Sequence, residues 1–279
     1  MASVQAMLHR RPALRLAGLL TPALLWLGLF YLLPLGFLLA TAFFATDSFT
    51  GRVIYTFTTE NVVEVLTNPA YLLTVVRTVA VAVGVTALCV VLAVPLAAYM
   101  ALVAGPRARP VLVALVVTPL WASYLVKAYA WRVLLAPEGP LGGLSPGYGW
   151  VAVVLTLTYL WLPYMILPLF AGLERLPDSL LEASADLGAR SWRTFRSVVM
   201  PMIVPSLFAG SIFTFSLSLG DYITVQIVGG KTQLIGNLVY ANIGAANNLP
   251  FAAALATIPV AVMVIYLFAV RRSGALEEL

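Results

Sequence analysis

Long stretches without a charged residue constrain this chain more than any other feature of its sequence. Residues 16–46 and 78–106 contain no Asp, Glu, Lys or Arg. A helix needs about 20 mostly apolar residues to cross the hydrocarbon core of a bilayer. Several segments meet this requirement, so we predict an all-α membrane protein with six transmembrane helices at residues 16–44, 72–101, 111–135, 150–173, 202–226 and 252–270.

The composition supports the membrane prediction and excludes other classes of protein. Of the 279 residues, 62% are hydrophobic and only 10% are charged, whereas soluble domains are about 45–50% apolar and about 25% charged. This excludes a soluble enzyme, a disordered chain and a nucleic-acid-binding domain. With one cysteine, Cys89, and one histidine, His9, the chain has neither a disulfide framework nor a Cys- or His-based metal site.

The Lys and Arg residues predict which ends face the cytoplasm. If the N-terminus is placed inside, eleven of the 16 basic residues fall in inner segments, two in outer loops and three near outer helix ends. Because cytoplasmic loops carry an excess of Lys and Arg, we expect both termini to be cytoplasmic. The predicted parts are a cytoplasmic segment at 1–15, a six-helix permease domain at 16–270 and a cytoplasmic tail at 271–279.

The longest predicted inner loop, residues 174–201, is charged and patterned for helix formation. Ser179 and Glu182 have the spacing of a capping box, which places a helix start near Leu180. Gly188 stands where a glycine would close that helix. The loop is therefore predicted to begin with one short helix and a tight turn.

A second short helix is predicted to follow the turn, with Ser191 as its cap and Pro201 at its end. The first helix presents small residues at Ala183, Ala185 and Gly188. Such a surface allows close approach of another protein, but it also suits a connector that packs on its own bundle. The residues alone leave both alternatives open.

A motif in this loop resembles a known family. The run Glu182-Ala183-Ser184-x3-Gly188-x9-Val198-x-Met200-Pro201 resembles the EAA motif of ABC-type importer permeases, E-A-A-x3-G-x9-I-x-L-P, with mild departures at positions three, seventeen and nineteen. The resemblance covers residues 71–270 and implies the type I ABC importer (MetI-like) permease fold. In that family the loop is the coupling helix that docks on an ATPase subunit. Its implied contact residues here are Glu182, Ala183, Ser184, Asp186, Gly188 and Pro201.

The resemblance also implies partners and a location. The chain would be a multi-pass protein of the bacterial inner membrane and would form half of a translocation pathway. It would pair with a second homologous permease subunit, two ATP-binding cassette ATPase subunits and a periplasmic or lipid-anchored substrate-binding protein. It would bind no cofactor, because ATP and Mg²⁺ belong to the ATPase. The segment 228–232, VGGKT, is not a P-loop, because Val225 stands where the first glycine is required.

A narrower resemblance concerns the substrate. Residues 218–230, 234–240 and 247–256 are similar to spermidine/putrescine permeases, which implies polyamine import. Permeases for iron, phosphonate and other small solutes share parts of these segments, so another small solute is the alternative. An ion-coupled secondary transporter is a more distant alternative, because the sequence has no convincing internal repeat. No catalytic constellation is present, so we predict no enzyme activity.

Polar residues on one face of the fifth predicted span are candidates for the substrate pathway. Ser211, Thr214, Ser218 and Asp221 are three, four and three residues apart, which places them on one helical face. A carboxylate at the end of a hydroxyl-lined face suits a cation path, and an ionisable residue in a span is a functional candidate. Asp221 follows Gly220, however, so a structural cap at a helix break is the alternative.

Aromatic residues of the fourth predicted span are further pathway candidates. Tyr159, Trp161 and Tyr164 could hold an organic cation by cation–π attraction, although packing between helices is the favoured interpretation. Lys127 and Arg132 are predicted to extend their charges toward the outer surface at the end of the third span.

Overall fold

The computed structural model describes residues 12–47 and 50–272, so most of the predicted segments 1–15 and 271–279, with His9, lie outside the described residues. Five helices are long and apolar enough to cross a membrane, and a bent helix pair makes a sixth span if it is counted as one. The count agrees with the prediction. The five helices cover Gly18–Thr41, Pro69–Val103, Trp150–Glu174, Ser191–Leu219 and Leu249–Arg271.

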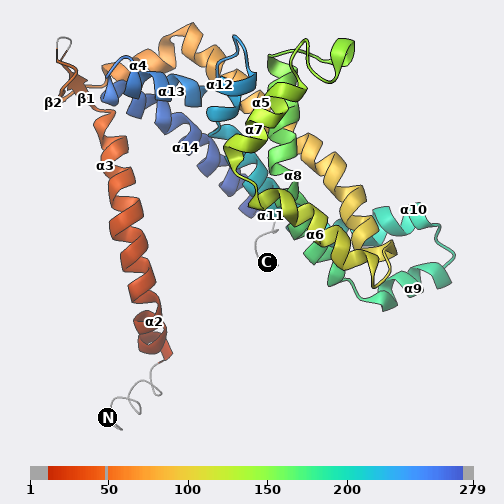
Figure 1. Cartoon of the computed structure of the whole chain (residues 1–279). Helices are drawn as coiled ribbons and strands as arrows, with labels where there is room; N and C mark the ends of the chain where they lie inside the picture. The colour runs from red at the N-terminus through yellow and green to blue at the C-terminus, as the bar shows by residue number, and fades with distance from the viewer. Residues whose placement is uncertain (1–11, 48–49, 273–279) are drawn as a thin grey trace.

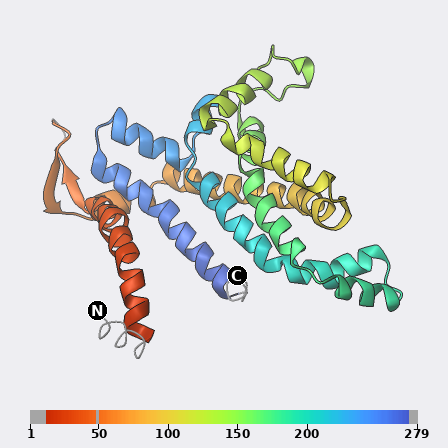
Figure 2. The same ribbon diagram turned by 60° about the horizontal axis from the view of Figure 1, so that its bottom comes forward.

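The first span stands apart from the other helices (Figure 1). None of the residues 18–41 is buried. The span contacts the rest of the chain mainly where its last helix meets α14, and Figure 2 shows the same separation from a second direction. Its apolar side chains therefore face lipid or another chain. It consists of α2 (Pro12–Leu27), a π-helical turn η1 (Gly28–Leu32) and α3 (Leu33–Thr41).

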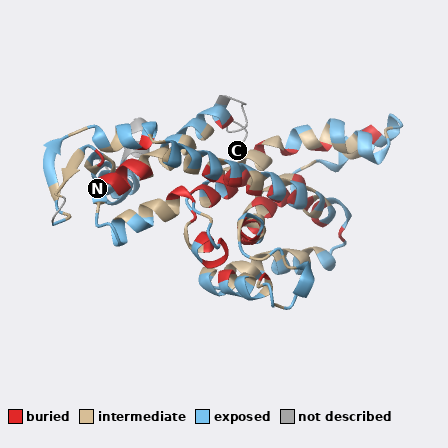
Figure 3. Cartoon of the chain, turned by 90° about the horizontal axis from the view of Figure 1, so that it is seen from above, coloured by how far each residue is buried: buried red, intermediate tan, exposed pale blue. Residues whose placement is uncertain are grey.

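Three long helices form the core of the molecule. In α5 the small residues Cys89, Ala93 and Ala97 follow one another at intervals of four and are fully buried, so they form one face that lets neighbouring helices approach closely. On α11, Gly210 lies against Met165 of α8. The buried residues concentrate where these helices meet (Figure 3). The three helices are α5 (Pro69–Ala98, extended by η2, Tyr99–Val103), α8 (Trp150–Glu174) and α11 (Met200–Leu219).

The third span is sharply bent, so the prediction of one helix over 111–135 was wrong. Helix α6 (Ala108–Trp121) and helix α7 (Tyr124–Leu134) meet at an angle of 95°. Ala122 and Ser123 between them both adopt extended backbone angles, with ψ of 140° and 138°. Two successive extended residues end one helix and redirect the next, which a count of apolar residues does not detect.

The fifth span begins earlier and ends earlier than predicted. The expected short helix that stops at Pro201 is instead the start of one helix that runs over Ser191–Leu219, through α10 (Ser191–Thr194), the π turn η4 (Phe195–Val199) and α11. The N–H of Met200 bonds to the carbonyl of Phe195, and this wider turn accommodates the proline that follows. The predicted outer end at residue 226 lies in a separate helix, α12 (Ile223–Val228).

Short elements cover the end of the bundle opposite α9 and α10 (Figure 1). They include a two-stranded antiparallel hairpin, which the all-α prediction did not contain. The last span is α14 (Leu249–Arg272). The remaining elements are β1 (Phe44–Thr46), β2 (Val53–Phe57), α4 (Glu60–Thr67), η3 (Gly142–Leu144), α9 (Asp178–Asp186) and α13 (Ile235–Gly244).

Candidate coupling loop and translocation helices

The elbow, which we define as residues 178–194, projects from the bundle as α9, a tight turn and α10 (Figure 1). Helix α9 begins at Asp178 after an extended Pro177, and no side chain caps it. The predicted capping box of Ser179 and Glu182 was therefore wrong. The proline excludes helical geometry before it, and the Asp178 carboxylate in the first turn already interacts favourably with the helix dipole.

The turn of the elbow was predicted correctly. Gly188 has a φ of +73°, which an L-residue with a side chain adopts only with strain. Its N–H donates to the carbonyl of Ala185 at 2.8 Å, and the N–H of Ala189 donates to the carbonyl of Ser184 at 3.1 Å. These bonds satisfy carbonyls at the end of α9, as expected for a glycine that closes a helix.

One side-chain hydrogen bond closes the inside of the elbow. Ser184 Oγ and Thr194 Oγ1 are 2.8 Å apart and join α9 to the start of the long helix. Ser191, the predicted cap, makes no capping bond, because Arg190 holds the N-cap position. The serine at the third position of the motif thus contributes a bond across the turn that an alanine could not make.

The elbow carries large apolar side chains that are exposed. Leu187 is 88% exposed and Trp192 is 70% exposed. Between the two arms lies a hollow of about 380 Å³, which Leu180, Ala183 and Arg193 help to line. Exposed large apolar side chains on an otherwise polar segment are typical of a surface that binds another protein. Of the other predicted contact residues, Glu182, Asp186 and Pro201 are also exposed.

The predicted hydroxyl stripe lies inside the subunit. Ser211 Oγ donates to the Phe208 carbonyl at 2.7 Å and is 2.6 Å from the hydroxyl of Tyr266 on α14. Thr214 Oγ1 donates to the Gly210 carbonyl at 3.2 Å. The Ser218 hydroxyl is buried and makes no hydrogen bond to another described residue. The stripe therefore faces neighbouring helices, and its predicted role in the pathway remains a prediction.

Asp221 lies in the break between α11 and α12, and its side chain is largely buried. Its carboxylate accepts hydrogen bonds from the Tyr124 hydroxyl, from the Thr224 N–H at 2.9 Å and from Thr224 Oγ1 at 3.2 Å. These bonds support the capping alternative. Sequence reasoning missed Tyr124 and Thr224, although a carboxylate in an apolar segment requires such hydrogen-bond donors nearby.

The predicted aromatic residues of α8 pack against other aromatic rings. Trp161 stacks with Tyr124 at 5.9 Å between ring centroids, and Tyr159 lies 5.4 Å from Trp131. Tyr164 contacts Trp161 at 5.9 Å in an edge-on arrangement. These contacts support the favoured interpretation of packing, and Trp161 and Tyr124 bring the aromatic cluster next to Asp221.

Two basic residues that were predicted to lie near outer helix ends have definite partners within the structure. Arg132 donates from Nη1 to the Ile227 carbonyl at 2.8 Å, and its guanidinium lies 5.3 Å from the Tyr148 ring centre. Arg77 lies 5.7 Å from the ring centre of Trp150. The prediction for Arg132 was therefore incomplete, because the side chain joins α7 to α12.

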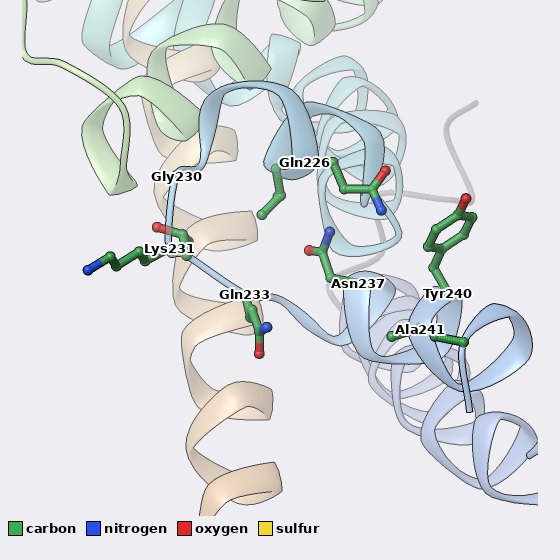
Figure 4. A pocket seen from close by; sticks show the side chains of 10 residues that line it. Gln226, Gly230, Lys231, Gln233, Asn237, Tyr240 and Ala241 are labelled. Carbon is green, nitrogen blue, oxygen red and sulfur yellow. The ribbon is translucent and has the colours of Figure 1, made fainter.

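A hollow of about 440 Å³ lies between α12 and α13. Figure 4 shows Gln226, Asn237 and Tyr240 beside it, with Lys231 directed away from them. Its lining is rich in amide groups and includes one basic residue, Lys231. Across residues 12–47 and 50–272 no group of three or more His, Cys, Asp or Glu side chains could hold a metal ion.

Comparison with known proteins places these features in a family. Residues 93–273 match the binding-protein-dependent transport system inner membrane component family. The chain belongs to this family. It is 42% identical to the Escherichia coli inner membrane ABC transporter permease protein YdcU, over 100% of this chain and 96% of that protein. It is 32% identical to the Haemophilus influenzae spermidine/putrescine transport system permease protein PotB, over 90% of this chain and 91% of that protein.

Two solved structures have the same fold. A bacterial ABC transporter involved in alginate import aligns with a TM-score of 0.69 at 16% identity, over 97% of this chain and 99% of that chain. The MetNI methionine ABC transporter aligns with a TM-score of 0.60 at 19% identity, over 72% of this chain and 93% of that chain. The protein is thus a multi-pass inner-membrane permease of an ABC importer and a non-catalytic transport component. Importers of this kind work with ATPase and substrate-binding partners.

Proposed function

We propose that this permease forms half of the translocation pathway of an ATP-driven polyamine importer and that its elbow docks on the ATPase. The observation that carries the docking proposal is the exposed apolar surface of Leu187 and Trp192 on a turn that carries an EAA-like motif. Burial of such side chains in a partner's cleft is favourable at about 25 cal/mol per Å² of apolar surface.

The proposed orientation places the elbow and both termini in the cytoplasm. The first described residues of α2, the last turn of α14 and the elbow all extend toward the end of the molecule opposite the hairpin (Figure 1). The excess of Lys and Arg in the corresponding segments supports the cytoplasmic assignment of that end.

The long helix provides a direct route from the elbow to the outer side. Residues 191–219 form one continuous helical stretch, about 40 Å long at 1.5 Å per residue. In the proposed assembly, two ATPase subunits hold the elbows of this chain and of a second, homologous permease. Closure of the ATPases on ATP would displace the elbow, and the helix would transmit this displacement to the outer half, where a binding protein delivers substrate.

The proposed substrate class rests on relatives and on chemistry. The PotB proteins of Haemophilus influenzae and Escherichia coli, 32% and 30% identical to this chain, are named as spermidine/putrescine permeases. The packing contacts of the α8 aromatic residues leave Tyr159 exposed and Trp161 and Tyr164 half-buried, and an accessible aromatic face attracts an organic cation by about 0.5–2 kcal/mol. Another small solute, such as iron or phosphonate, is the alternative, and the ligand of the cognate binding protein would distinguish them.

The test is uptake by the complete importer in membrane vesicles. We expect ATP-dependent accumulation of labelled putrescine or spermidine. Glu182→Lys reverses a charge on the exposed surface of α9, so we expect it to abolish both co-purification of the ATPase and uptake. Gly188→Trp should have the same effect through the turn.

Glu138→Lys is the matched control, because Glu138 is an exposed carboxylate in the loop between α7 and α8, outside the elbow. It should retain ATPase binding and uptake. Retained assembly and uptake in both elbow variants would contradict docking through the elbow. Uptake of a different solute, with no response to polyamines, would contradict only the substrate assignment.

A further inference from the structure

The bend of the third span is hydrogen-bonded to the break of the fifth span. Tyr124 is the first residue of α7, directly after the bend, and Asp221 and Thr224 flank the start of α12. The Tyr124 hydroxyl donates to Asp221 Oδ2, lies 2.5 Å from Thr224 Oγ1 and accepts from the Thr224 N–H at 3.2 Å. Four polar groups from two separate helix breaks thus share one network.

A second contact joins the far ends of the same two helices. Arg132 near the end of α7 donates to the carbonyl of Ile227 near the end of α12 at 2.8 Å. The first residues of α7 are thus bonded to the first residues of α12, and the last turns of the two helices are bonded to each other. The two helices therefore lie side by side and run in the same direction. The N–H of Gly149 also donates to the Val228 carbonyl at 3.0 Å and connects this pair to the first residues of α8.

Helix α13 also bonds to the break between α11 and α12. Asn237 Nδ2 donates to the Tyr222 carbonyl at 3.0 Å. The N–H of Ile235 donates to Thr78 Oγ1 of α5 at 3.0 Å, so the start of α13 is itself fixed to the core. We call residues 220–224, with Tyr124 and Asn237, the outer junction.

Burial makes the network costly to open. Asp221 and Thr224 are buried, and Trp161 stacks on the ring of Tyr124. A buried carboxylate that loses its hydrogen-bond donors must find others or take up a proton. Because separation of α7 and α12 would remove the Tyr124 donor from this buried carboxylate, the two helices separate only with difficulty.

We propose that Tyr124 is a positioning residue that fixes α7 to α12, so that the bent third span and the end of the fifth span move as one rigid unit during transport. The proposal rests on the proposed function for its transport readout. In this role Asp221 is the acceptor that holds Tyr124 and the start of α12, and it does not bind the transported cation. The long helix then moves α7 whenever the elbow moves.

Kinetics of uptake by the complete importer test this assignment. Tyr124→Phe keeps the ring that stacks on Trp161 and removes only the hydroxyl. We expect the maximal rate of putrescine uptake to fall at least about tenfold with KM unchanged, because binding is retained and the conformational step is impaired. Tyr129→Phe is the control, since Tyr129 lies exposed on the same helix, and it should behave as wild type.

Asp221→Asn separates positioning from substrate binding. Asparagine keeps an acceptor for the Thr224 N–H, and the hydroxyls of Tyr124 and Thr224 can reverse their bonds to accept from the new amide. Positioning predicts uptake within about threefold of wild type with KM unchanged. A rise of KM of about tenfold or more in Asp221→Asn, together with wild-type uptake in Tyr124→Phe, would overturn the proposal.

A distance measurement tests the rigid unit independently of the substrate. Spin labels at Val126 on α7 and Gln226 on α12, both exposed, are placed in the assembled complex with other reactive cysteines removed. We expect one narrow distance that is the same with and without ATP, and a broadened or shifted one in Tyr124→Phe. A distance that changes with ATP in wild type would overturn the proposal, even if the importer carries no polyamine.

Discussion

The elbow and the outer junction are two turns at opposite ends of the same continuous helix, and they are stabilised in different ways. The elbow depends on a left-handed Gly188 and on one side-chain hydrogen bond between Ser184 and Thr194, and its Leu187 and Trp192 are exposed. In the outer junction, side chains of α7 and α13 bond to the break after α11. Asp221 and Thr224 within it are buried.

The difference indicates that the two ends of this helix have different roles. In the proposed mechanism, the elbow binds and releases another protein and has few internal bonds, whereas the outer junction keeps two spans together and is buried. Substitutions at the outer junction should therefore reduce the stability of the fold as well as transport. Substitutions at the elbow should reduce transport while the fold remains intact.

The largest loss of stability is expected from Gly236→Val at the outer junction. A Cβ at this position would lie 3.0 Å from Tyr222 Cβ and 3.1 Å from the Asp221 carbonyl oxygen. A branched side chain forces the break away from α13, and overpacking of this kind costs about 1–3 kcal/mol. The midpoint of thermal unfolding of the purified complex should fall clearly.

Gly244→Val is the control for this prediction. It lies on the same helix with open space around its Cβ position, so its midpoint should stay near that of wild type. Equal midpoints for both variants would show that the junction is not closely packed and would remove the contrast with the elbow.

Gly188→Val at the elbow should reduce transport much more than it reduces stability. Its φ of +73° forces strain on any residue with a Cβ, about 1–2 kcal/mol, which shifts the equilibrium constant between the native turn and other conformations by roughly tenfold. ATP-dependent uptake should fall by up to this factor while the unfolding midpoint of the bundle changes little. Gly105→Ala, in another inner loop with open space around it, should transport normally.

The sequence predicted the parts of the fold that depend on hydrophobicity and on local turn chemistry. Uninterrupted apolar stretches located all six spans, because burial in lipid demands them. Gly188 was predicted correctly because a helix that ends in a left-handed residue selects glycine. The apolar stretches and the glycine can both be recognised from a short, local piece of the sequence.

The breaks and the bonds across them could not be predicted in this way. Neither Ala122 nor Ser123 is a glycine or a proline, so the local sequence does not mark the 95° bend between α6 and α7. Of the two partners of Asp221, Tyr124 is 97 residues away in the sequence and Thr224 is three residues away. The sequence therefore identified the carboxylate but could not choose between pathway and cap, since that choice depends on contacts between distant segments.

A smaller effect on transport is expected from Thr194→Val, which keeps the shape of the side chain and removes its hydroxyl. The elbow then loses the bond to Ser184, and a hydrogen bond of this kind contributes about 1 kcal/mol. Uptake should fall a few-fold, and amide exchange should quicken in α9 while α11 stays protected. Ser197→Ala, an exposed hydroxyl further along the same helix, is the control. Unchanged exchange in α9 would mean that the turn alone holds the elbow.

The smallest effect is expected from Glu174→Gln, just before the elbow. Glu174 pairs with Arg109 at 3.4 Å, and the two side chains are 41% and 39% exposed. Exposed ion pairs contribute about 0–1 kcal/mol, and Arg109 also donates to the Ala101 carbonyl at 2.6 Å, so it keeps a partner. The unfolding midpoint should hardly change, at low or at high salt. A shift as large as that of Gly236→Val would mean that charge holds the inner end as firmly as buried hydrogen bonds hold the outer one.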